Sequence, residues 1–169
     1  MRVLIAVLAC VLFFACNEAP KGVLLQLPGA KDVELSTLRG MNTLQYKLNV
    51  RYPAHREIQQ VKDHLQKLGW KPLPYIYLFP KNPSSNVQGW TFFNDPPRDP
   101  AWVIYEWTGD WLDHDGNLVT YTFRYRDPIG KYRSSTFIVG PSQNEMTVTA
   151  LYTPAGIAKH KQAMLNGEK

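Results

Sequence analysis

The chain has 169 residues, which is the length of one domain with terminal extensions. With 44% hydrophobic residues, five Trp and nine Tyr, it can bury a sizeable core, which excludes a wholly disordered protein. The formal net charge of +5 is small and is spread along the sequence without a block of like charges, which argues against a nucleic-acid-binding protein.

Residues 1–15 have the pattern of an export signal. Arg2 is their one charged residue, and an apolar stretch runs from Val3 to Ala15. A stretch of about 13 apolar residues is too short for a bilayer core, which needs about 20, and suits the apolar region of a signal peptide. Ala15-Cys16 resembles the lipobox of bacterial lipoproteins. This resemblance implies that Cys16 is the lipid acceptor and becomes the first residue of the mature chain.

Alternatives to lipidation at Cys16 remain open. Phe13 stands where the lipoprotein family prefers Leu, and Ala9-Cys10 forms a competing lipobox with a shorter apolar region. Simple secretion or an uncleaved anchor would also fit. No cysteine follows Cys16, so the mature chain can form no internal disulfide. Asn17 resembles the residue that follows the acceptor in outer-membrane lipoproteins, which implies a cell-envelope location on the periplasmic face if the host is Gram-negative.

Residues 16–40 are expected to be the lipidated N-terminus and a tether, and residues 41–153 a single α+β domain. Strict alternation from Thr43 to Tyr52 predicts a half-buried strand. Residues 54–68 are expected to form one amphipathic helix, because apolar residues recur at helical spacing up to a stop at Gly69. A strand at residues 75–79 completes a strand-helix-strand unit. The apolar stripe of the helix consists of Ile58, Val61, Leu65 and Leu68.

Residues 80–100 contain five prolines, so we expect a long irregular loop with neither sheet nor helix. Trp90, Phe92 and Phe93 lie within it, and large apolar side chains in a loop either pack on the domain or contact a partner. We expect Phe92 or Phe93 to pack on the domain and Trp90 to be partly exposed. Together with Trp102, these three are the candidate partner-binding residues.

Residues 101–153 are expected to form a four-strand antiparallel meander, and residues 154–169 a polar C-terminal tail. A three-residue turn at 114–116, with Gly116 in the left-handed conformation, places Trp107 opposite Phe123 and Glu106 opposite Arg124. One face of the sheet is then aromatic, and the helix should cover it.

The next turn in the meander is expected at residues 127–130, where Pro and Gly occupy favoured positions. This turn places Phe137 opposite Tyr121, with the following strand of residues 145–153 beyond it. The complete expectation is a strand-helix-strand unit followed by the meander, with the helix packed on one face of the sheet.

Each candidate for catalysis or metal binding has a simpler structural explanation. The run from Asp113 to Asn117 resembles the start of a calcium loop but lacks the later ligands, and its residues suit a tight turn. The four histidines have no metal-ligand spacing, and there is no Gly-x-Ser-x-Gly motif. Glu106 among tryptophans could act as an acid, although pairing with Arg124 is simpler. We therefore predict no catalytic residue, metal or cofactor.

The mature chain has one further resemblance. Leu27-Pro28-Gly29-Ala30, an alternating strand, and Tyr52-Pro53-Ala54 leading through the helix to Gly69-Trp70 look like a pattern that recurs in small bacterial envelope lipoproteins of unassigned activity. The resemblance covers about 50 of the 169 residues and implies no catalytic residues. We expect a non-catalytic lipoprotein that binds the membrane through its lipid and another envelope component, protein or glycan. The alternative is a small-ligand-binding protein or hydrolase with a pocket between helix and sheet near Glu106.

Overall fold

The computed structural model of the chain describes residues 19–73, 90–95, 102–128 and 144–159. Within these ranges it has one long helix and seven strands, and all strand pairings are antiparallel. The predicted α+β class with a mainly antiparallel sheet is therefore confirmed. In chain order the elements are β1 (Lys31–Leu38), β2 (Met41–Asn49), α2 (His55–Lys67), β3 (Lys71–Pro72), β4 (Thr91–Asp95), β5 (Trp102–Leu112), β6 (Leu118–Pro128) and β7 (Glu145–Thr153).

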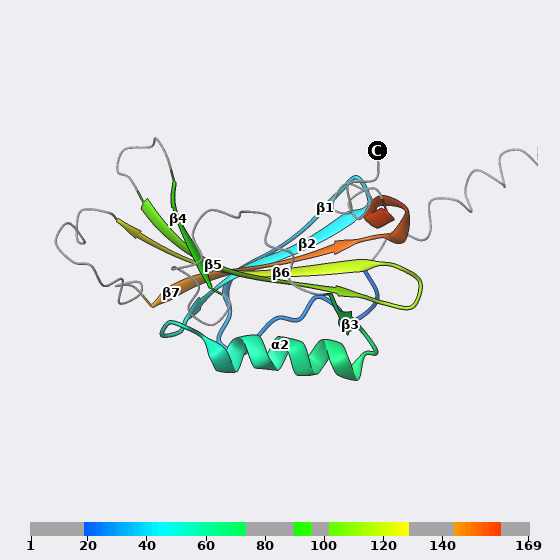
Figure 1. Cartoon of the computed structure of the whole chain (residues 1–169), viewed down its shortest axis with the longest axis horizontal. Coiled ribbons are helices and arrows are strands. Elements are labelled where there is room, and N and C mark those ends of the chain that lie inside the picture. The colour runs from blue at the N-terminus through cyan, green and yellow to red at the C-terminus, as the bar shows by residue number, and fades with distance from the viewer. Residues whose placement is uncertain (1–18, 74–89, 96–101, 129–143, 160–169) are drawn as a thin grey trace, which may run out of the picture.

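The last strand in the sequence lies in the middle of the sheet. The strand order is β1-β2-β7-β6-β5-β3, and β4 pairs with another part of β5. The first half of β5 pairs with β4, and its last two residues pair with β3. Because β7 pairs with both β2 and β6, it joins the N-terminal hairpin to the β5–β6 hairpin in one continuous sheet (Figure 1).

The predicted register of the β5–β6 hairpin is confirmed. Trp107 lies opposite Phe123, and Glu106 lies opposite Arg124. Gly116 has a φ of 82°, the left-handed conformation that the three-residue turn requires. The turn chemistry specified this register, and the alternation of apolar and polar residues on the two strands agrees with it.

The predicted neighbour of β6 is wrong. Tyr121 lies opposite Gly109 of β5 on one side and Ala150 of β7 on the other, so it cannot pair with Phe137. The four-strand meander therefore does not describe the order of the sheet. Alternation specifies the two faces of a strand but not its neighbours, and β7 alternates as clearly as the segment that we placed beside β6. Residues 129–143, and the strand expected at 75–79, lie outside the described residues.

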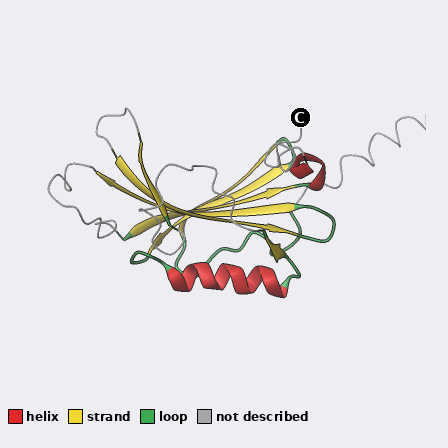
Figure 2. Cartoon of the chain, in the orientation of Figure 1, coloured by secondary structure: helices red, strands yellow, loops and turns green. Residues whose placement is uncertain are grey.

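Helix α2 agrees closely with the predicted span. It follows Ala54, and the chain turns away from it at Gly69, whose φ is 82°. Leu68 stands after the last helical turn and is 45% exposed, so it does not belong to the buried stripe. Figure 2 shows the helix lying along one face of the sheet. The three residues that the helix buries are Ile58, Val61 and Leu65.

The face of the sheet next to α2 is lined by large apolar side chains. They belong to one buried cluster with the apolar residues of the helix, and the Nζ atom of Lys62 in α2 lies 5.4 Å from the centre of the Trp107 ring. Edge-to-face ring contacts extend across the cluster, for example between Trp107 and Phe123 and between Trp111 and Tyr121. The aromatic members on the sheet are Tyr46, Tyr105, Trp107, Trp111, Tyr121, Phe123, Tyr125 and Tyr152.

The segment expected to be a tether belongs to the folded body from residue 19 onward. Residues 31–38 form β1, which pairs with β2, and Val23 and Leu27 are buried in the main cluster. The apolar run at 23–27 could have indicated a short strand, but it does not alternate, so its sequence did not show that it packs on the domain; the structure has no strand at these residues. The folded domain therefore begins about twenty residues earlier than the predicted boundary at 41.

The proline-rich segment also contains a strand. Residues 91–95 form β4, with Phe92 opposite Tyr105 and Phe93 opposite Ile104. We expected no sheet in 80–100 because of its prolines, but these flank the five residues of β4 and do not interrupt them. Residues 74–89 and 96–101 lie outside the described residues.

Candidate functional site

Residues 19–30, which we call the N-terminal strap, cross the aromatic face of the sheet beside α2 (Figure 1). Two buried tyrosines hold the strap. The Tyr121 hydroxyl donates to the Val23 carbonyl at 2.8 Å and accepts from the Leu25 N–H at 2.6 Å. The Tyr46 hydroxyl donates to the Leu25 carbonyl at 3.0 Å and accepts from the Leu27 N–H at 3.4 Å. An extended strap needs such partners, because buried main-chain groups without hydrogen bonds are costly.

The strap is also fixed at its start. The Ala19 N–H donates to Asn42 Oδ1 at 2.9 Å, and Asn42 Nδ2 donates to Thr37 Oγ1 at 2.8 Å. Asn42 and Thr37 face each other next to the turn of the β1–β2 hairpin. The first described residue is therefore bound to the closed end of this hairpin. Further along the strap, His64 Nε2 of α2 lies 2.7 Å from the Gly22 carbonyl oxygen.

The tyrosines that hold the strap have raised pKa values. Burial raises the pKa of Tyr46 to about 12, although the hydrogen bond to Leu27 opposes the shift. Burial also raises the pKa of Tyr121, and the nearby Tyr46 adds to this effect. Both hydroxyls therefore stay protonated near neutral pH and act as donors to the strap, which is a structural role.

The outer edge of β1 is the most exposed apolar feature among the described residues. All eight residues of the strand are exposed, and within the described part of the chain it pairs with β2 alone. Leu35 is 71% exposed, Leu38 69% and Val33 43%. A free sheet edge with exposed apolar side chains is a ready template for pairing with another chain.

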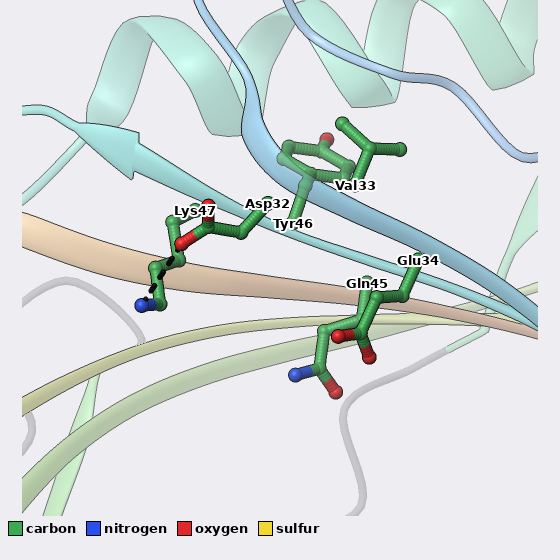
Figure 3. A pocket seen from close by; sticks show the side chains of 6 residues that line it. All are labelled: Asp32, Val33, Glu34, Gln45, Tyr46 and Lys47. Atoms are coloured by element: carbon green, nitrogen blue, oxygen red, sulfur yellow. Dashed lines mark ion pairs between the residues drawn. The ribbon is translucent and has the colours of Figure 1, made fainter.

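The two halves of this edge differ. The first half has a bulge between Lys31 and Glu34, where Asp32 has a positive φ of 51°. Its Asp32 carboxylate lies 3.1 Å from the Lys47 ammonium, and these charges border a shallow hollow (Figure 3). Bulges and charges protect sheet edges from unwanted pairing. The second half, residues 35–38, has neither a bulge nor a charged residue.

Figure 3 shows how the side chains around the bulge are divided between the two faces. Tyr46 and Val33 point toward the side of α2, whereas Glu34 and Gln45 lie on the other side. Both the polar groups and these two side chains line the hollow, and Tyr46 is also buried in the core. Nothing in this arrangement pairs a nucleophile with a base, so we assign the hollow no chemistry.

The structure removes Trp90 from the candidate partner-binding residues. Its side chain is 1% exposed, and its ring contacts those of Tyr52 and Tyr125, with centroids 5.2 Å and 5.5 Å apart. The indole Nε1–H donates to the Pro53 carbonyl at 3.0 Å. The expected partial exposure is wrong because the residue before β4 inserts into the core, and the indole finds a main-chain acceptor there. Proline content alone gave no sign of this insertion.

The other three candidate partner-binding residues are placed by their main chain only. Phe92 and Phe93 lie in β4, and Trp102 begins β5 opposite Asp95. They thus come together at one edge of the sheet, although they are 9 or 10 positions apart in the sequence. Their side chains lie outside the part that the structure describes, and so does Cys16.

Glu106 lies on the opposite face of the sheet from α2. Its neighbours Tyr105 and Trp107 belong to the buried cluster next to the helix, and alternation directs Glu106 away from it. Its carboxylate accepts a hydrogen bond from Arg124 Nε at 2.9 Å, and the Arg124 Nη2 group also contacts it. Pairing with Arg124 is therefore confirmed. A pocket between helix and sheet at Glu106 is wrong, because the side chain does not face that space.

The acidic β5–β6 turn is held by its own hydrogen bonds. The Asp113 carboxylate accepts from the N–H groups of Asp115 and Asn117 at 2.9 and 2.8 Å, and from Asn117 Nδ2 at 2.7 Å. These contacts are those of a side-chain-capped turn. In the described ranges, no three His, Cys, Asp or Glu side chains come together in a way that could hold a metal ion. None of the described helices is long and apolar enough to cross a membrane.

Comparison with known proteins gives no relative. A search against protein-family models finds no match, and searches of curated proteins and of solved structures find no significant match either.

Proposed function

We propose that this protein is a non-catalytic lipoprotein of the bacterial cell envelope, anchored by Cys16, whose domain binds another envelope component. The proposed anchor is supported by the sequence of residues 1–16, in which Arg2, an apolar stretch and Ala15 precede the cysteine. Acyl chains on a single residue suffice to hold a domain when more than one chain is attached. The location is then the cell envelope, on the periplasmic side of the outer membrane in a Gram-negative host.

The anchor is tested by a matched pair of cysteine variants. Cys16→Ser should abolish incorporation of a labelled fatty acid and release the protein from membranes, or leave its signal peptide uncleaved. Cys10→Ser is the control, because it removes the competing lipobox and leaves Cys16 intact, so it should be lipidated normally. Loss of labelling in Cys10→Ser alone would move the acceptor to Cys10, and labelling of neither wild type nor control would overturn the proposal.

The surface that best suits a partner is the outer edge of β1. Its second half offers main-chain groups that no described strand other than β2 pairs with, and it carries Leu35, the most exposed of the large apolar side chains in the described ranges. A protein partner could add a strand to this edge, with main-chain hydrogen bonds giving affinity and Leu35 giving specificity. A protein fits this edge better than a glycan, because strand addition needs a polypeptide main chain. The helix α2, on one face of the sheet, leaves this edge uncovered (Figure 1).

Crosslinking in intact cells tests the edge. A photoreactive residue in place of Ser36 should give a crosslinked species of defined mass, and Leu35→Lys should abolish it, because a lysine on an edge strand discourages pairing. The control is the same photoreactive residue in place of Glu34, in the half with the bulge, where little crosslinking is expected. Equal crosslinking at both positions, or none at Ser36, would rule out the β1 edge as the partner site.

A further inference from the structure

We propose that the closed end of the β1–β2 hairpin contacts the lipid surface of the membrane, with Leu38 and Arg39 in the headgroup layer. This inference rests on the proposed lipid anchor at Cys16 and adds to it an orientation of the domain and a second membrane contact. The partner is the surface of the bilayer that carries the acyl chains.

The chain between Cys16 and the described part of the domain is short. Only Asn17 and Glu18 separate Cys16 from Ala19, and three extended residue steps span at most about 11 Å. The polar layer on one side of a bilayer is about 5–8 Å thick. Since Ala19 is hydrogen-bonded to Asn42, the chain lets the domain move only a few ångströms away from the surface. The tether that we expected over 16–40 would have allowed such movement, but the strap removes it.

The position of Ala19 on the domain supports the same orientation. Through Asn42 it is bound to Thr37, one residue before Leu38, at the closed end of the hairpin. Asn42 also lies opposite Tyr152 near the end of β7, so the helical turn at 155–159 follows at the same end of the sheet. Figure 1 shows this turn next to the β1–β2 hairpin. A short anchor at Ala19 therefore turns this end of the sheet toward the bilayer.

The residues at this end have side chains that suit a membrane surface. Leu38 is 69% exposed and Ile157 is 38% exposed, and exposed apolar side chains are stable in the interfacial layer of a membrane. Three basic residues accompany them and suit anionic headgroups. The β5–β6 turn at the same end is acidic, with His114 and Asp115 exposed and 3.3 Å apart, so the headgroup contact is assigned to the β1–β2 hairpin and not to this turn. The three exposed basic residues are Lys21, Arg39 and Lys159.

Cysteine labelling of the lipidated mature protein, which begins at Cys16, tests this orientation. No cysteine follows Cys16 in the sequence, so Leu38→Cys introduces a single free thiol for a fluorescent probe. The protein is reconstituted in vesicles of phosphatidylcholine and phosphatidylglycerol that contain a headgroup-labelled quencher lipid. The control is Asn49→Cys, an exposed position at the other end of β2, about 27 Å from Met41.

The expected result is several-fold stronger quenching of the probe at position 38 than at position 49. Arg39→Glu in the Leu38→Cys protein should reduce that quenching without detaching the protein. Equal quenching at the two positions, in protein that still floats with the vesicles, would overturn the orientation and leave the lipid anchor standing. Protein that does not float with the vesicles would overturn the anchor and this inference with it.

Discussion

The hydroxyl of Tyr121 donates a hydrogen bond to the main-chain carbonyl of Val23, with 2.8 Å between the oxygen atoms and 98 positions between the residues in the chain. The same hydroxyl accepts from the Leu25 N–H, so one buried side chain satisfies two main-chain groups of the strap. The beginning of the domain is therefore built into its core.

Tyr121→Phe should destabilise the domain by about 1–3 kcal/mol, because it leaves the Val23 carbonyl and the Leu25 N–H buried without their partner. Urea unfolding followed by circular dichroism measures the change. Tyr125→Phe is the control, since its hydroxyl makes one bond, to the Val50 carbonyl at 3.0 Å, and its cost should be smaller. A smaller loss for Tyr121→Phe than for Tyr125→Phe would contradict the double role of Tyr121.

Trp90→Ala should cost about 3–5 kcal/mol of stability, as expected for the removal of a large buried aromatic side chain. It also leaves the Pro53 carbonyl without its donor. Leu35→Ala is the control. Because Leu35 is 71% exposed, this substitution should change the free energy of unfolding by no more than about 0.5 kcal/mol. Thermal melts of both variants distinguish a core residue from a surface one, and a Trp90→Ala melt close to that of the wild type would refute the core assignment.

The sequence predicted those parts of the fold in which two independent patterns agree. The β5–β6 hairpin combines alternation with a left-handed Gly116, and α2 combines an apolar stripe with a stop at Gly69. The neighbour of β6 could not be predicted in this way, because alternation is the same for a strand at any place in the sheet. Strand β7 lies in the middle of the sheet because it pairs with β2, which is distant in the sequence, and no local pattern predicts such a pairing.

The candidate site was less predictable than the fold. The strap depends on hydroxyl groups of Tyr46 and Tyr121, and in the sequence these residues look like ordinary members of an aromatic face. A short apolar run at 23–27, soon after Cys16, was the available signal that the domain begins early. The pairing of Glu106 with Arg124 could be predicted, because the cross-strand register places the two residues opposite each other.

Gly109→Ala should destabilise the domain by about 1–3 kcal/mol through overpacking. A Cβ atom at this position would lie 2.6 Å from Trp111 Cη2 and 2.7 Å from Trp107 Cη2, and both rings are buried. The matched control is Gly156→Ala, where nothing lies within 4 Å of the added atom. Urea unfolding should show the control unchanged or slightly more stable, and an equally stable Gly109→Ala would mean that the two rings can move apart at no cost.

Glu106→Gln should change stability by less than about 1 kcal/mol, because the Glu106–Arg124 pair is partly exposed to solvent and screened. The same small effect is expected for Arg124→Gln, and the double variant should show a coupling of similar size. Urea unfolding of the wild type, the two single variants and the double variant gives the coupling energy by a double-mutant cycle. A coupling of several kcal/mol would indicate that the pair is part of a buried network and would reopen the question of a special role for this carboxylate.

Tyrosine ionisation should make the domain unstable at high pH. Burial raises the pKa of Tyr46 from its ordinary value of 10.0 to about 12, so its contribution to stability is fully present below pH 10 and is lost as the pH rises toward 12. Above pH 10 the unfolded chain releases a proton that the folded chain retains, which favours unfolding. Burial also raises the pKa values of Tyr121 and Tyr125, so these residues steepen the loss of stability with pH.

Urea unfolding between pH 8 and pH 12 should give a free energy of unfolding that stays nearly constant up to about pH 10 and then falls. Tyr46→Phe removes one of these ionisable groups. The free energy of unfolding of this variant should be lower than that of the wild type at pH 8 and should fall less steeply as the pH rises. Parallel curves for Tyr46→Phe and the wild type would show that the Tyr46 hydroxyl ionises as readily in the folded chain as in the unfolded one, and would refute its burial beneath the strap.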